Sequence, residues 1–179
     1  FGRTGKLFGF QNYGIVPDII AIGKGMASGM PVGAFVSSYE RMQLLAHNPK
    51  MGHITTFGGN PVIAAASLVT LQELLTTNLM EDTLRKERLF KQYLQHPLIE
   101  SINGRGLMLA VIVPSAEIAN YVFEYCQDNG LIVYWLLFEL RAVRLSPPLT
   151  LTDEEIKEGC DIIIEALESY RLQLEAIGD

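Results

Sequence analysis

Apolar and polar positions follow different periods along the chain, and each pattern predicts one kind of element. Early in the chain, two short apolar runs at 19–22 and 34–36 are separated by glycine-rich sequence. A continuous apolar run of this length is typical of a strand buried on both faces, as in a parallel sheet. We therefore expect two inner strands of an α/β sheet, with Lys24 between two glycines directly after the first strand.

A clear helix start follows these strands. Asn60 is a favourable N-cap, and Pro61 occupies the first helical position, where a missing N–H leaves no hydrogen bond unmade. Apolar residues then recur at helical spacing to about Thr77. The small residues at 64–67 predict close packing of this helix against another stretch of backbone. A shorter helix is expected over 39–46.

Strands and helices alternate in the remainder of the chain, which predicts a separate α+β unit. The expected helices are 79–95, 118–128 and a C-terminal helix that starts with a capping box at Thr152–Glu155. The expected strands are 107–113, 131–135 and 142–145. Because the composition changes after Asn78, we predict a domain boundary there and two parts, 1–78 and 79–179.

Composition and charge argue against several classes of function. The 179 residues carry 20 acidic and 14 basic side chains, and no local cluster of lysine or arginine predicts a nucleic-acid or membrane partner. No apolar run approaches the roughly 18 residues of a membrane span. Two distant cysteines, Cys126 and Cys160, predict reduced thiols in a cytoplasmic protein. The three histidines share no ligand spacing, so we predict no metal site.

Lys24 is the most informative candidate for chemistry. A lysine that follows a buried strand emerges at the carboxyl edge of the sheet, where open α/β sheets bind ligands. Partial desolvation at that edge favours the neutral amine, which is a nucleophile and forms a Schiff base with an aldehyde. The spacing alone leaves open the alternative that Lys24 is a solvated lysine on a glycine turn.

Two further places are candidates for binding anions. Thr55 and Thr56, beside Gly58 and Gly59, offer hydroxyl and backbone N–H donors that suit a phosphate, although an ordinary loop has the same composition. Arg144 lies in an apolar strand, where its guanidinium needs a partner. That partner is either an internal Asp or Glu or the carboxylate of a substrate.

Several segments, spread over essentially the whole chain, occur in the order found in one enzyme family. They are Phe1-Gly-Arg-Thr-Gly-Lys6, Val16-Pro-Asp-Ile-Ile20, Gly23-Lys-Gly25, Met30-Pro-Val-Gly-Ala34, His53-Ile-Thr-Thr-Phe-Gly-Gly-Asn-Pro61, Gly104-Arg-Gly-Leu-Met108 and Val143-Arg-Leu-Ser-Pro-Pro-Leu149. This succession resembles the C-terminal portion of the class III pyridoxal-phosphate aminotransferases, which include the ornithine, acetylornithine, 4-aminobutyrate and putrescine enzymes. The resemblance implies part of a fold-type I transferase, with 1–78 in the large cofactor-binding domain and 79–179 as the small C-terminal domain.

The resemblance also implies roles for three residues. Lys24 matches the lysine that binds pyridoxal 5′-phosphate as a Schiff base and shuttles a proton during amino-group transfer. Thr56 matches a threonine that contacts the cofactor phosphate of the neighbouring subunit, which implies a homodimer. Arg144 matches the arginine that binds the substrate carboxylate in ornithine- and glutamate-using members. The implied substrates are an amino acid or ω-amine as donor and a 2-oxo acid as acceptor.

One departure from the family limits what the chain is expected to do alone. In the family, an Asp-Glu-x-x-Thr-Gly stretch precedes the segment that starts at Phe1, and its aspartate pairs with the pyridine nitrogen of the cofactor. We therefore expect the N-terminal portion to be absent and the 179-residue chain to be inactive, or nearly so, by itself. The alternatives are an aminomutase or a decarboxylase of the same fold, or a non-catalytic association module.

Overall fold

The chain forms two compact units. The computed structural model describes residues 1–178, with side chains as far as 176. The first unit contains Phe1 and Leu7–Asn78, and the second contains Gly2–Lys6 and the residues from Leu79 onward. The chain passes from one unit to the other after Asn78, the position at which the sequence predicts a boundary. The sequence does not predict that Gly2–Lys6 packs with the second unit.

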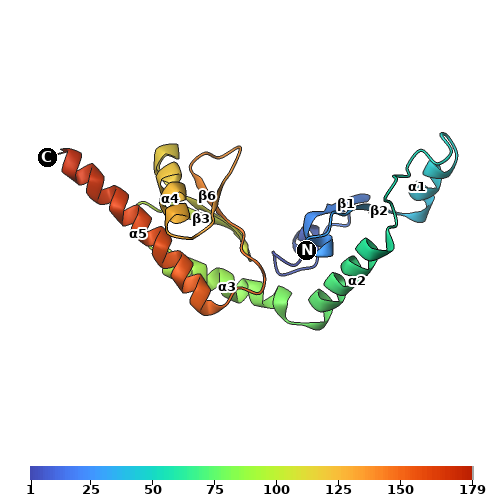
Figure 1. Ribbon diagram of the computed structural model, residues 1–179, viewed down its shortest axis with the longest axis horizontal. Coiled ribbons are helices and arrows are strands. Elements are labelled where there is room, and N and C mark those ends of the chain that lie inside the picture. Colours follow the sequence, from blue (N-terminus) through green and yellow to red (C-terminus); the bar gives the residue numbers. More distant parts are fainter. Residues whose placement is uncertain (179) are drawn as a thin grey trace. The chain divides into compact units, whose positions relative to one another are not determined.

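The first unit contains a small antiparallel sheet (Figure 1). Strand β1 (Ile19–Gly23) pairs with β2 (Gly33–Ser37), and the short helix η2 (Lys24–Ala27) lies in the connection. The expectation of inner strands buried on both faces, as in a parallel sheet, is wrong for this chain, since the two strands form an antiparallel pair. No residue of either strand is buried, because each strand has one partner and the described residues of this unit cover neither face.

Helix α2 (Pro61–Thr76) starts as the sequence predicts. The Asn60 side chain accepts hydrogen bonds from the backbone N–H groups of Val62, at 3.0 Å, and Ile63, at 3.3 Å. The close packing predicted for 64–67 is found in part: Ser67 is buried and the helix packs against η2, whereas Ala64 and Ala65 are exposed. The other helices of this unit are short: η1 (Gly9–Tyr13), α1 (Tyr39–Gln43) and η3 (Leu44–Ala46).

The second unit is a four-stranded antiparallel sheet packed against helices. The strand order is β3 (Ser101–Arg105), β4 (Met108–Ile112), β6 (Ala142–Leu145) and β5 (Tyr134–Trp135). Strand β3 is not predicted by the sequence pattern, and the strand predicted over 131–135 forms only at Tyr134–Trp135. The helices are α3 (Leu79–Tyr93), α4 (Ala116–Asp128) and α5 (Asp153–Gly178), with α3 and α4 both packed against α5 (Figure 1).

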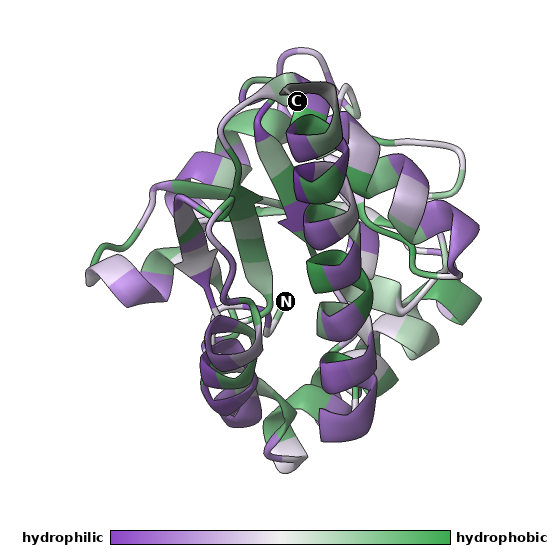
Figure 2. Ribbon diagram, turned by 90° about the vertical axis from the view of Figure 1, so that its left-hand side faces the viewer, coloured by the Kyte–Doolittle hydropathy of each residue, from purple (hydrophilic) through white to green (hydrophobic). Residues whose placement is uncertain are grey.

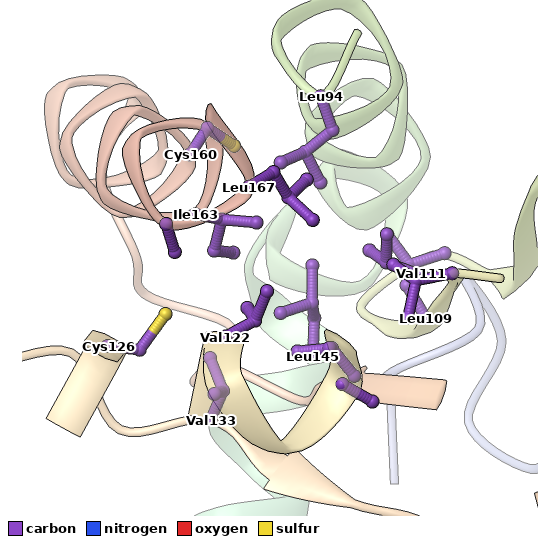
Figure 3. Close-up of a cluster of buried hydrophobic side chains, with 14 of the residues drawn as sticks. Leu94, Leu109, Val111, Val122, Cys126, Val133, Leu145, Cys160, Ile163 and Leu167 are labelled. Carbon is purple, nitrogen blue, oxygen red and sulfur yellow. The ribbon is translucent and has the colours of Figure 1, made fainter. Parts of the chain in front are cut away.

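The hydrophobic core of the second unit lies between the sheet and these helices. Figure 2 shows that hydrophobic and hydrophilic positions alternate along α5, as expected for an amphipathic helix. Its apolar residues Ile163 and Leu167 are buried and point toward Val122 of α4 and Leu145 of β6 (Figure 3). The helix begins with the predicted capping box, in which the backbone N–H and side chain of Thr152 are each hydrogen-bonded to the same downstream glutamate.

The segment Gly2–Lys6 forms hydrogen bonds with the turn between β3 and β4. The backbone N–H of Leu107 donates to the carbonyl of Arg3 at 2.7 Å, and Arg105 donates to the carbonyl of Thr4 at 3.2 Å. Gly106 has a φ of +60°, and a Cβ atom on it would lie 2.1 Å from the Arg3 carbonyl oxygen. Only glycine therefore permits this close approach.

No single helix in the described part of the chain is long and apolar enough to cross a membrane; α2 and α3 reach that length and composition only when the bent pair is taken together.

Candidate functional site

Lys24 lies directly after β1, at the start of η2. Its backbone has a φ of +53°, in the left-handed region that non-glycine residues rarely adopt. Such a conformation costs on the order of 1–3 kcal/mol and is found most often at functional turns. The side chain is exposed, so the residues of this chain do not supply the desolvation that the sequence analysis expects.

The loop before α2 presents unengaged donors. Thr55 and Thr56 are both exposed, and in the described part of the chain neither hydroxyl forms a hydrogen bond. The loop is held by its backbone, since the N–H of Gly58 donates to the carbonyl of Thr55 at 3.1 Å. Gly59 has a φ of +73° and no atom near its missing Cβ position. The two threonine hydroxyls therefore remain available for an anion.

A cavity of about 510 Å³ lies between this loop, α2 and the segment around β2. Its lining is largely apolar, and Thr55 contributes to it, whereas Thr56 and Lys24 do not. The cavity is lined by Met26, Pro31, Val32, Gly33, Thr55, Phe57, Gly58, Gly59, Asn60, Ile63, Ala64, Ser67, Leu68 and Leu71. Among the described residues, this cavity therefore does not bring Lys24 and Thr56 together.

Arg144 lies on β6, on the sheet face opposite the helices. Its strand neighbours Val143 and Leu145 are buried in the core, and side chains alternate between the two faces of a strand. The guanidinium carbon of Arg144 lies 4.8 Å from the centre of the Tyr134 ring, a cation–π contact. Its Nε is buried without a hydrogen-bond partner, and no described residue forms an ion pair with it. The internal acidic partner that the sequence left open is thus not found among the described residues.

Sequence reasoning missed the importance of two neighbours of this site, Tyr134 and Arg3. Tyr134 pairs with Arg144 across β5 and β6. Arg3 is half-buried, and its side chain donates to the carbonyl of Leu107 at 3.3 Å. Burial, and secondly the charge of Arg144, lower the pKa of Arg3 below its usual value. Only the position of Arg3 in the first segment of the resemblance could have drawn attention to it.

The two cysteines contribute to the core and not to a reactive site. Both are buried and free, and burial raises the pKa of Cys126 and of Cys160 to about 12. A thiol with so high a pKa carries almost no thiolate at neutral pH and is a poor nucleophile. The candidate chemistry therefore stays with Lys24, the Thr55–Gly59 loop and Arg144.

Comparison with known proteins identifies the family. The sequence model of the aminotransferase class-III family matches residues 1–167. The chain belongs to the class III aminotransferases. Among curated relatives of this class III chain, acetylornithine aminotransferase from Oceanobacillus iheyensis is 38% identical over 97% of the chain, and putrescine aminotransferase from Pectobacterium atrosepticum is 37% identical over 90%.

Solved structures confirm the expected fold class, a mixed helix-and-sheet part of a fold-type I transferase. Ornithine aminotransferase from Toxoplasma gondii matches 96% of the class III chain with a TM-score of 0.84 and 31% identity. A transaminase from the marine bacterium Virgibacillus matches 97% of it with a TM-score of 0.88 and 26% identity. The chain spans 37% to 44% of the length of these four proteins.

Proposed function

We propose that the protein containing this class III chain transfers an amino group from an amino acid or ω-amine to a 2-oxo acid, with pyridoxal 5′-phosphate bound to Lys24. The observation that carries the proposal is the placement of Lys24 directly after β1, in a left-handed turn with an exposed side chain. The relatives named as acetylornithine, putrescine and ornithine aminotransferases support this substrate class.

The donor groups of the chain fit the parts of pyridoxal phosphate. Lys24 supplies a primary amine for the aldehyde, and Thr56 supplies a hydroxyl, unengaged in the described part of the chain, for the phosphate. In keeping with what the resemblance implies, we assign Thr56 to the phosphate held by the neighbouring subunit of a homodimer. When bound, the cofactor supplies an electron sink for carbanion chemistry at the substrate carbon.

Each residue of the site then has a defined task. Lys24 Nζ anchors the cofactor at rest and, when the substrate amine has replaced it, is the base that removes the proton from the carbon bearing the amino group. Arg144 binds and orients the substrate carboxylate, since its guanidinium has no acidic partner among the described residues. The Tyr134 ring holds that guanidinium in place.

The surface of the first unit supports the proposed subunit contact. Large apolar side chains are exposed on α2 and on the loop before it, among them Phe57, Leu68, Val69 and Leu75. Exposed apolar patches of this kind mark protein–protein contact. We assign these side chains to the contact through which Thr56 reaches the second subunit.

The test is covalent capture in the polypeptide that carries this chain at the full length of its relatives. After loading with pyridoxal phosphate, borohydride reduction and peptide mapping should find the pyridoxyl group on the peptide that contains Lys24. The K24A variant should show neither the adduct nor amino-group transfer. K6A, which removes another exposed lysine, is the matched control and should retain both.

Three results would contradict the proposal. They are a pyridoxyl group on a different lysine, no adduct at all, or undiminished amino-group transfer by K24A. Product analysis separates the alternative enzymes, because release of carbon dioxide in place of a new amino acid would indicate a decarboxylase. Amino-group transfer that survives in K24A would favour a non-catalytic association role for this part of the protein.

A further inference from the structure

The second unit contains two half-buried arginines, Arg3 and Arg144, whose positive charges are not neutralised by a carboxylate among the described residues. Four of the eight arginines of the chain are paired with a carboxylate: Arg41 with Asp18, Arg85 with Asp82 and Asp153, Arg141 with Glu100 and Glu139, and Arg171 with Glu168 and Glu175. The other four have no such partner within residues 1–178, and of these Arg88 and Arg105 are exposed, whereas Arg3 and Arg144 are half-buried. Their charges therefore need another explanation.

The sheet register shows why no acid stands beside Arg144. Its neighbours across the two adjacent strands are Ala110 and Tyr134, and the next residue in the same row is Asn103 of β3. None of these carries a negative charge. The Nε of Arg144 is also buried without a hydrogen-bond acceptor. This is unfavourable for a charged donor unless a ligand supplies the acceptor.

Arg3 is brought to the same unit by backbone bonds that do not involve its charge. Its carbonyl accepts from the N–H of Leu107 at 2.7 Å, and its guanidinium donates to the carbonyl of Leu107 at 3.3 Å. Leu107 directly precedes β4, the strand that pairs with the strand of Arg144. Burial, and then the charge of Arg144, lower the pKa of Arg3, as expected for two guanidinium groups close enough to repel each other.

We infer that Arg3 is a second substrate-binding residue, and that Arg3 and Arg144 together bind one carboxylate of the substrate. The inference rests on the proposed function, in which Arg144 binds a carboxylate. Planar guanidinium groups match the geometry of carboxylate oxygens. An anion shared by the two arginines accepts from the unpartnered Nε of Arg144 and removes the repulsion between the two charges.

Titration calorimetry with 2-oxoglutarate, on the full-length polypeptide that carries this chain (the parent chain), tests this inference. The R3Q and R144Q variants should each bind 2-oxoglutarate about tenfold more weakly or worse, the change expected when a charged hydrogen bond is lost. The R3K variant keeps the positive charge but loses the planar guanidinium with its paired N–H donors. Its affinity for 2-oxoglutarate should therefore lie between that of R3Q and that of the parent chain. R88Q is the control, because Arg88 is exposed and carries the same charge without a partner among the described residues.

Independent mapping uses an arginine-selective dicarbonyl reagent. In the parent chain, 2-oxoglutarate should protect Arg3 and Arg144 from modification and leave Arg88 unprotected. Unchanged affinity in R3Q with weakened affinity in R144Q would overturn the role of Arg3 and leave the proposed function intact. Unchanged affinity in both variants, or no binding by the parent chain, would overturn both. Tighter binding of inorganic phosphate than of 2-oxoglutarate would overturn the assignment of a carboxylate.

Discussion

Replacing Gly106 with alanine should detach the segment Gly2–Lys6 from the second unit. At a φ of +60°, alanine is strained by about 1–2 kcal/mol. Its Cβ would also lie 2.1 Å from the Arg3 carbonyl oxygen, well inside any real contact, so the carbonyl must move away. That movement breaks the 2.7 Å bond from Leu107, which contributes about 1 kcal/mol. We therefore expect the G106A substitution to lower the free energy of unfolding by about 2–3 kcal/mol in total.

Gly130 provides the matched control for this substitution. It has a φ of +81° but no atom within 4 Å of its missing Cβ position, so G130A carries the backbone strain without the clash. In urea unfolding, the free energy of unfolding of G130A should be about 1–2 kcal/mol lower than that of the parent chain. Hydrogen exchange at the Leu107 amide should accelerate in G106A and remain slow in G130A. Equal stability of the two variants, together with a protected Leu107 amide in G106A, would refute this account of the segment.

Two further predictions concern the second unit. Leu167 is fully buried, so L167A should reduce the free energy of unfolding by about 2–5 kcal/mol. L172A, at a half-exposed position on the same helix, should change it far less, and urea unfolding that finds equal losses would contradict the core assignment. Arg171, and secondly His96, lower the pKa of Glu168 from 4.5 to about 2. The charged form therefore stabilises the fold above about pH 4.5, and this contribution disappears as the pH falls toward 2. A plot of stability against pH should be flatter in E168Q across that window; identical slopes would refute this linkage.

Local patterns were sufficient to predict most elements of the fold. The cap at Asn60 and the capping box at Thr152 depend on neighbouring residues only, and both form as predicted. The missed strand β3 has the sequence Ser-Ile-Asn-Gly-Arg, which shows neither an apolar run nor an alternating pattern. It forms because β4 provides a partner, and that information lies outside its own sequence. The environment of β1 was mispredicted for a related reason, since an apolar run does not reveal whether anything covers it.

In the candidate site too, some residues can be predicted from their neighbours in sequence, and others depend on contacts between distant parts of the chain. Lys24 after a strand, and Arg144 inside an apolar strand, stand out from their immediate neighbours and could be named from the sequence. Arg3 could not, because its place beside the start of β4 depends on hydrogen bonds between the first residues of the chain and the turn at Gly106. The missing side chain of Gly106 is what allows the Arg3 backbone to bond to Leu107. A glycine that looks like a simple turn former therefore determines where a positive charge lies, and the G106A variant should weaken 2-oxoglutarate binding as well as stability if Arg3 shares the carboxylate with Arg144.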